Sequence, residues 1–119
     1  DGVLLVAHMG GDALFRVSLD GKEVTKVIVR GGVLFGDGIT LVSPDQLAVA
    51  SLWSGVKLVE SKDQWLSANV TQVYSSPRHR LATSVTVKDG DVYANYLNGF
   101  GIPYTSTISR VPFKPRSVE

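Results

Sequence analysis

Val24-Thr25-Lys26-Val27 returns as Val70-Thr71-Gln72-Val73, 46 positions further along the chain. A second segment recurs twice: residues 2–7 match residues 46–51 after 44 positions, and these match residues 91–96 after another 45. A repeat of about 45 residues built from short apolar strands is typical of the blades of a β-propeller. The repeat therefore predicts an all-β propeller chain, and its 119 residues hold about two and a half four-stranded blades.

The composition narrows the classes of partner. A length of 119 residues fits one domain, and a net charge of +1 gives no reason to expect nucleic acid as a partner. The chain has no cysteine, so neither disulfides nor thiolate metal sites can form. No apolar run approaches the roughly 20 residues of a membrane-spanning helix, so we expect no membrane partner. Because the sequence begins at Asp1, with neither an initiator methionine nor a signal peptide, we expect a processed or excised piece.

Alternating apolar and polar residues, separated by turn residues, divide the chain into expected strands. Asp20-Gly21 and Asp89-Gly90 supply the positive φ that tight hairpins need. No stretch keeps a helical apolar stripe over three turns, so no helix is expected, and residues 63–66 are interpreted as a hairpin loop anchored by Trp65. The expected strands cover about residues 2–9, 13–19, 23–29, 38–43, 46–52, 55–61, 69–75, 82–88, 91–97 and 106–113.

Alignment of the repeats assigns each strand a position within a blade. Residues 38–75 form one complete blade, residues 2–29 form strands two to four of the blade before it, and residues 82–113 form strands one to three of the blade after it. The glycine-rich residues 31–38 have neither Walker spacing nor a following helix, so we interpret them as the crossover between two blades. The alternative fold is a small β-sandwich whose strands resemble one another by chance.

Such a set of blades cannot close into a ring by itself. Propellers need about four to eight blades, and open strand edges invite pairing with other chains. We therefore expect a second chain, the N-terminal part of the same precursor, to supply the remaining blades. Assembly of identical copies is the alternative, but a missing innermost strand in the first blade favours a specific donor.

Two stretches resemble a known superfamily. Phe35-Gly36-Asp37-Gly38-Ile39, which enters an innermost strand, resembles the Asp/Asn-Gly-Ile/Leu signature of the SMP-30/gluconolactonase and strictosidine-synthase-like propellers, and residues 77–93 are similar to the C-terminal region of plant members. The resemblance implies six blades, hence about 265 residues at this spacing, and makes residues 1–119 the C-terminal part of one propeller domain. It implies metal-assisted hydrolysis of a lactone or ester. A non-catalytic binding or storage-type propeller with a degenerate central site is the alternative.

Asp37 is the residue that matches the family's central cation site. The resemblance implies a divalent cation, often calcium, held by side chains at the starts of innermost strands, and such hard cations need several oxygen ligands. The equivalent position in the next blade, at residues 82–84, offers no carboxylate. Asp37 is therefore either a metal ligand or an Asp-Gly turn residue that bonds to its own backbone.

Four further residues are candidates for function. His8, at the end of an expected strand, is either a catalytic general base or a hydrogen-bonded strand-end residue. Phe100 and Tyr104 lie in a long loop that either binds a small-molecule ligand or packs on the surface. Asn69-Val70-Thr71 is an N-glycosylation acceptor triplet, which is either modified at Asn69 in a secreted or vacuolar protein or present by chance.

Overall fold

The fold is all-β, as the strand pattern predicts. The computed structural model describes residues 2–77, 80–98 and 105–115, and this part of the chain contains eleven strands and no α-helix. Within the same residues, no helix has the length and apolar character that crossing a membrane would require. The strands form three sheets, which follow one another along the chain.

The first sheet is a three-stranded antiparallel meander in the order β1-β2-β3. Its register pairs Val3 with Ser18 at one end of β1 and His8 with Ala13 at the other. The turn after β2 is stabilised by Asp20, whose Oδ1 accepts hydrogen bonds from the Ser18 hydroxyl and the Lys22 amide. The strands are β1 (Val3–His8), β2 (Ala13–Ser18) and β3 (Val24–Lys26).

The middle sheet has five strands in the order β4-β8-β7-β6-β5. Strands β5 to β8 pair in sequence order and antiparallel, whereas β4 adds to the outer edge parallel to β8. Gly55 makes the β6–β7 turn possible, because its φ is +86° and a Cβ there would lie 2.0 Å from the Tyr74 carbonyl oxygen. The strands are β4 (Ile28–Arg30), β5 (Gly38–Ser43), β6 (Gln46–Ala50), β7 (Val56–Glu60) and β8 (Ser67–Tyr74).

The expected strand at residues 23–29 is divided between two sheets. At Val27 the chain leaves the first sheet, because the Val27 amide donates to Leu14 of β2 while the next amide, of Ile28, donates to Leu66 beside β8. The Val27 side chain is buried between the two sheets. Burial of this side chain, which alternation cannot predict, fixes the point at which the strand changes sheet.

The third sheet is antiparallel in the order β11-β10-β9. Its last strand ends at Val111, earlier than the expected end at residue 113, because Pro112 has no N–H to continue the ladder. The following residues turn back to β8, where the Lys114 amide and carbonyl bond to the side-chain amide of Gln72. The strands are β9 (Leu81–Lys88), β10 (Asp91–Leu97) and β11 (Ser106–Val111).

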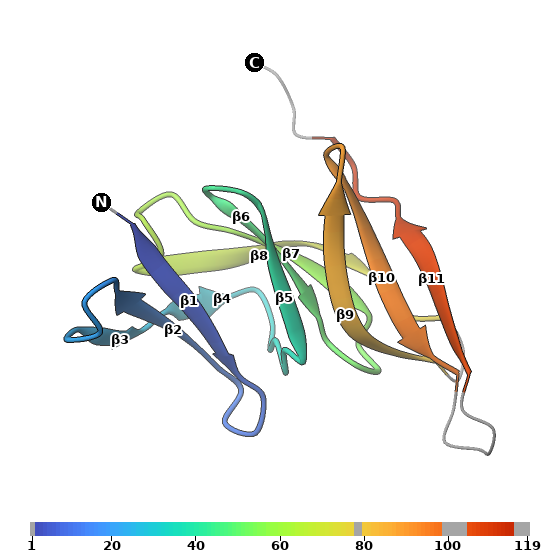
Figure 1. Cartoon of the computed structure of the whole chain (residues 1–119), viewed down its shortest axis with the longest axis horizontal. Coiled ribbons are helices and arrows are strands. Elements are labelled where there is room, and N and C mark those ends of the chain that lie inside the picture. Colours follow the sequence, from blue (N-terminus) through green and yellow to red (C-terminus); the bar gives the residue numbers. More distant parts are fainter. Residues whose placement is uncertain (1, 78–79, 99–104, 116–119) are drawn as a thin grey trace.

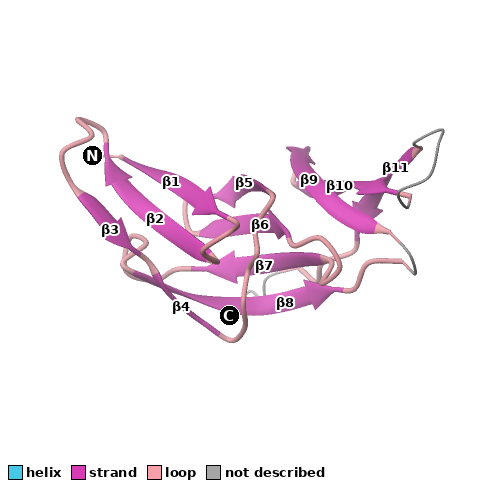
Figure 2. Ribbon diagram, turned by 90° about the horizontal axis from the view of Figure 1, so that it is seen from below, coloured by secondary structure: helices cyan, strands magenta, loops and turns pink. Residues whose placement is uncertain are grey.

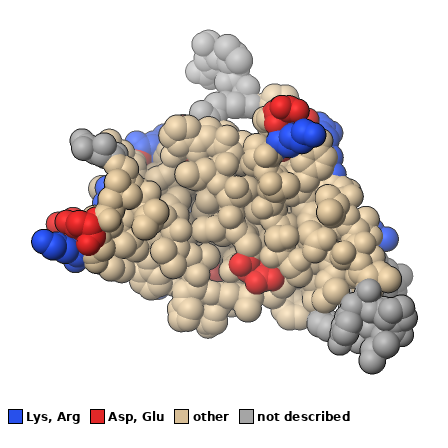
Figure 3. Space-filling view, in the orientation of Figure 1, with Lys and Arg blue, Asp and Glu red and all other residues tan. Residues whose placement is uncertain are grey.

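The three sheets stand side by side like an opened fan (Figures 1 and 2). Strands β1, β5 and β9 lie on one side of this fan, and β4 and β8 lie on the other (Figure 2). Viewed from the side of β1, β5 and β9, the surface is mostly uncharged: charged side chains lie mainly at its margins, and one acidic group lies in its lower middle (Figure 3). Adjacent sheets therefore diverge from a common side instead of closing into a two-layer sandwich.

A close contact joins β5 to β9. A Cβ on Gly38 would lie 2.8 Å from the Cα of Ser84 and 2.8 Å from the carbonyl oxygen of Thr83, so only glycine allows this approach. Nearby, Leu52 and Ala82 exchange backbone hydrogen bonds in an isolated antiparallel bridge. These backbone contacts connect the middle and third sheets along their inner strands.

Two apolar cores separate the sheets, and the middle sheet contributes to both. Alternate residues of β6 point in opposite directions: Leu47 and Val49 enter the first core, whereas Ala48 and Ala50 enter the second. This explains why β6 is apolar from Leu47 to Ala50, as strands covered on both faces are. The first core contains Leu14, Val27, Leu34, Leu47, Val49, Val59, Trp65 and Ala68, and the second contains Ala48, Ala50, Val56, Ala82, Val92, Ala94, Tyr96 and Val111.

The loop between β7 and β8 is anchored by Trp65, as predicted. Trp65 is 4% exposed, and its Nε1 donates a hydrogen bond of 2.9 Å to the Pro44 carbonyl oxygen. Asp63 holds the loop by accepting hydrogen bonds from the amide and hydroxyl of Ser67. These bonds to Ser67 lower the pKa of the Asp63 carboxyl below its ordinary value.

Candidate functional site

Two candidate residues, His8 and Asp37, lie at the same edge of the molecule. His8 is the last residue of β1, and Asp37 directly precedes β5. The C-terminal end of β1 and the N-terminal ends of β5 and β9 lie along the lower edge of the fan (Figure 1). The neighbours of the two residues are close, since a Cβ on Gly36 would lie 3.6 Å from the Cβ of Ala7.

The His8 side chain is exposed and turns back over the loop that follows it. A Cβ on Gly11 would lie 2.8 Å from His8 Nδ1, so the imidazole ring covers this glycine. The same loop is closed by a hydrogen bond of 3.0 Å from the Asp12 amide to the Met9 carbonyl oxygen. The ring is accessible to solvent, but its contacts are with its own turn.

Asp37 is also exposed, and its backbone is fixed by a hydrogen bond of 2.9 Å from its amide to the Ala50 carbonyl oxygen. The left-handed residue of this segment is Phe35, with a φ of 40°, and not Asp37. The strand start in the third sheet carries Thr83 and Ser84, which supply hydroxyl groups and no carboxylate. Asp37 therefore presents one carboxylate to solvent at the start of β5.

The described residues do not form a complete cation site around Asp37. Within residues 2–77, 80–98 and 105–115, no three His, Asp or Glu side chains gather closely enough to hold a metal ion. A hard cation needs about six to eight oxygen ligands, and one carboxylate cannot supply them. Asp37 fits the role of a single contributing ligand and no more.

Of the remaining candidates, Asn69 lies in the described part of the chain. Phe100 and Tyr104 fall outside the described residues. Asn69 lies within β8 with an exposed side chain, and its backbone is in register with Glu60 of β7 and Arg30 of β4. The acceptor asparagine thus points outward from a paired strand.

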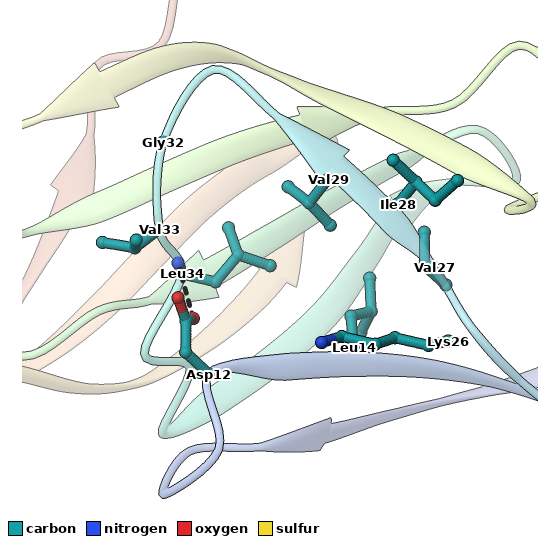
Figure 4. Close-up of a pocket in the computed structure, with 9 residues that line it drawn as sticks. All are labelled: Asp12, Leu14, Lys26, Val27, Ile28, Val29, Gly32, Val33 and Leu34. Carbon is teal, nitrogen blue, oxygen red and sulfur yellow. Dashed lines mark hydrogen bonds between the residues drawn. The ribbon is translucent and has the colours of Figure 1, made fainter.

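The sequence patterns did not predict a cavity of about 430 Å³ between the first sheet and the crossover to β5 (Figure 4). Leu14 and Leu34 point toward each other across it, and Lys26 extends below them toward Asp12 (Figure 4). Its volume is within the range of small-molecule sites, about 300–1,000 Å³. The residues that line it are Asp12, Leu14, Lys26, Val27, Ile28, Val29, Gly32, Val33 and Leu34.

The polar groups beside this cavity are largely engaged in holding the crossover. Asp12 Oδ1 accepts hydrogen bonds of 2.9 Å from the Leu34 amide and 2.8 Å from the Phe35 amide. From the opposite side, Lys57 Nζ donates to the Val33 carbonyl oxygen. The cavity can accommodate an apolar group, but its carboxylate is already bonded to the backbone.

Lys57 is an unusual residue, because it is a lysine only 6% exposed within β7. Burial lowers the pKa of its ammonium below the ordinary value, and the nearby Asp12 carboxylate partly opposes this effect. A single charge inside the apolar run Val56-Lys57-Leu58-Val59 is the sequence signal that could have identified it. Its hydrogen bond to the crossover gives it a structural role.

Two comparisons with known proteins found no relative of this chain. Neither a scan against protein-family models nor a search of the curated proteins gives a match for the chain.

Proposed function

We propose that this chain forms consecutive blades of a six-bladed propeller similar to the SMP-30/gluconolactonase group, in a ring that a second polypeptide completes. The observation that best supports this proposal is the fan of three sheets, in which β1, β5 and β9 share one side. A sandwich would cover one face of each sheet, whereas the middle sheet is covered on both faces. Sheets that diverge in this way leave room for further blades at both ends of the fan.

For the completed ring we propose metal-assisted hydrolysis of a lactone or ester, which is the activity that the family resemblance implies. Asp37 would contribute one oxygen ligand to a divalent cation such as Ca²⁺, and the other ligands would come from the partner blades. His8, exposed at the same edge, would be the general base. The described residues do not complete the cation site, so no step of the reaction is assigned to the metal.

Calcium titration of the purified native assembly tests this role of Asp37. Asp37→Asn should weaken Ca²⁺ binding by about tenfold or more, because the ligand loses its charge. Asp20→Asn is the matched control, since Asp20 is an exposed aspartate bonded within its own hairpin turn. If the native assembly binds no divalent cation, the metal-assisted hydrolase is rejected.

A second candidate is a non-catalytic binding propeller with a degenerate centre, possessing the same blades but no cation. The shortage of carboxylates at the strand starts favours it, because the start of β9 offers only Thr83 and Ser84. The two candidates differ in turnover. Lactone hydrolysis that requires Ca²⁺ and is lost in Asp37→Asn supports the enzyme, and absence of turnover in the presence of excess Ca²⁺ supports the binding protein.

We also propose that Asn69 carries an N-linked glycan and that the protein is secreted or vacuolar. The exposed side chain of Asn69 on β8 supports this, because an acceptor asparagine must be reached by the transferase. Digestion of the native protein with a peptide N-glycosidase should lower its mass by one glycan. No mass change would contradict the modification.

A further inference from the structure

Strand β1 has one neighbour where its counterparts in the repeat have two. The repeat aligns β1 with β6 and β10. Strand β6 pairs with β5 and β7, and β10 pairs with β9 and β11, whereas β1 pairs with β2 alone among the described strands. Within residues 2–77, 80–98 and 105–115, no strand takes beside β1 the place that β5 and β9 take in their sheets.

Side-chain exposure follows this difference. Leu47 and Val49 of β6 are 1% and 0% exposed, while the aligned residues of β1, Val3 and Leu5, are only partly buried. The opposite face of β1 is more exposed still, with Leu4 at 53%. Natural edge strands are usually protected by charges, proline or a bulge, and β1 carries none of these before its terminal His8.

A cavity of about 310 Å³ lies between β1 and β5. Leu41, on β5, is 51% exposed and borders this cavity, although it is on the same face of β5 as Ile39, which packs against the first core. Trp65 closes one end, and Arg16 crosses below with a hydrogen bond of 2.8 Å from its Nε to the Gln64 carbonyl oxygen. The lining residues are Gly2, Val3, Leu5, Arg16, Leu41, Pro44, Gln64 and Trp65.

We propose that a β-strand from outside residues 1–119 pairs antiparallel with β1 and fills this cavity with its alternate apolar side chains. The orientation follows from the pairs β5–β6 and β9–β10, which are both antiparallel. Backbone hydrogen bonds to β1 would provide affinity, and the pocket between Leu5 and Leu41 would select an apolar side chain, as in other cases of strand addition. The inference rests on the proposed function in that the donor is expected to be part of the same ring.

A peptide that copies β5 is a suitable probe, because β5 pairs with β6, which the repeat aligns with β1. The probe carries residues 36–43, Gly-Asp-Gly-Ile-Thr-Leu-Val-Ser, with a fluorescent label, and is titrated into the 119-residue chain. We expect saturable binding, measured by anisotropy, and slower hydrogen exchange of the β1 amides than in the free chain, with no change in β11. A peptide with Thr40→Pro and Val42→Pro lacks two donors and should bind at least about tenfold more weakly.

Two protein variants identify the binding surface. Leu41→Gln removes an apolar wall of the cavity at a half-exposed position, so the fold is retained and affinity should fall about tenfold. Ile108→Gln, on β11 of the far sheet at 71% exposure, is the matched control and should leave affinity unchanged. A second apolar-to-glutamine change that leaves the fold intact, Leu66→Gln at 51% exposure, lies outside the cavity and serves as a further control.

The inference is overturned if the folded chain gives β1 no protection in the presence of peptide, or if Leu41→Gln and the proline peptide bind as well as the originals. It is also overturned if β1 is protected in the peptide-free chain by pairing with a second copy, since the occupant is then the chain itself. A different result would reject the proposed function: a native particle that contains no propeller blades beyond those formed by residues 1–119. Strand addition could fail while that particle still contains a second polypeptide.

Discussion

The two outer sheets of the fan differ in the faces that no other sheet covers. The free face of the first sheet is largely apolar, because the register brings together Leu4, Val6, Phe15, Val17 and Val24, with Lys26 opposite Phe15 as its charged member. The free face of the third sheet is polar, because Tyr93 and Asn95 are in register there with Ser84, Thr86, Ile108 and Arg110. Leu4 and Val24 are 53% and 62% exposed, so the apolar face is open to solvent.

This difference bears on how a ring would be completed. Identical copies joined head to tail would place the apolar face of one copy against the polar face of the next, which leaves polar groups without partners. A different polypeptide can match each face separately. The difference between the two faces therefore supports the proposal that blades other than copies of residues 1–119 complete the ring.

The largest expected effect comes from the side chain that fills the first core. Trp65→Ala removes a residue 4% exposed and its hydrogen bond to Pro44, and should lower the free energy of unfolding by about 3–5 kcal/mol. Urea denaturation measures this change. Trp53→Ala, at 72% exposure, is the matched control and should change stability by less than about 0.5 kcal/mol. Equal effects of the two substitutions would contradict the burial of Trp65 in the first core.

A smaller effect is expected where the middle sheet meets the third. Gly38→Ala places a Cβ 2.8 Å from the backbone of β9, so the two strands must separate at a cost of about 1–3 kcal/mol. Gly10→Ala is the control, because its Cβ would meet only the His8 ring, at 3.8 Å. Hydrogen exchange should locate the loosening at β9. Unchanged stability in Gly38→Ala would show that the β5–β9 contact is looser than described.

The buried lysine beside the first core predicts a dependence of stability on pH. Since the pKa of Lys57 is lower in the folded chain than in the unfolded chain, the unfolded state binds more protons between these two values, and stability rises with pH across this window. The unfolding free energy of the wild type should therefore increase relative to that of Lys57→Met as pH rises toward 10.5. Urea titrations of both proteins at several pH values measure this difference. A difference that stays constant with pH would mean that Lys57 is solvated in the folded state.

The smallest effect is expected for an exposed ion pair on the third sheet. The pair Arg110–Asp91 joins Nε and Oδ1 at 3.4 Å, with both side chains about half exposed. Such surface pairs contribute little, so Arg110→Ala should lower stability by less than about 1 kcal/mol, and added salt should remove the difference. A larger, salt-independent loss would indicate that Arg110 has a packing role on this face.

Sequence patterns predicted the strands well because alternation and turn residues act locally. They did not predict the division at Val27, which depends on a buried contact between two sheets. The apolar run around Lys57 contained a signal, but its partner, the Val33 carbonyl, lies 24 positions earlier and is set by tertiary structure. The proximity of His8 and Asp37 likewise depends on how the first sheet packs against the middle sheet.

The mass of the native particle that contains this chain tests the central claim most directly. Native mass spectrometry of the purified particle should reveal further propeller blades in a second polypeptide bound to this one, giving a mass well above 12.8 kDa. A soluble, folded particle of 12.8 kDa, with no other polypeptide, would contradict the incomplete ring and the strand donor together.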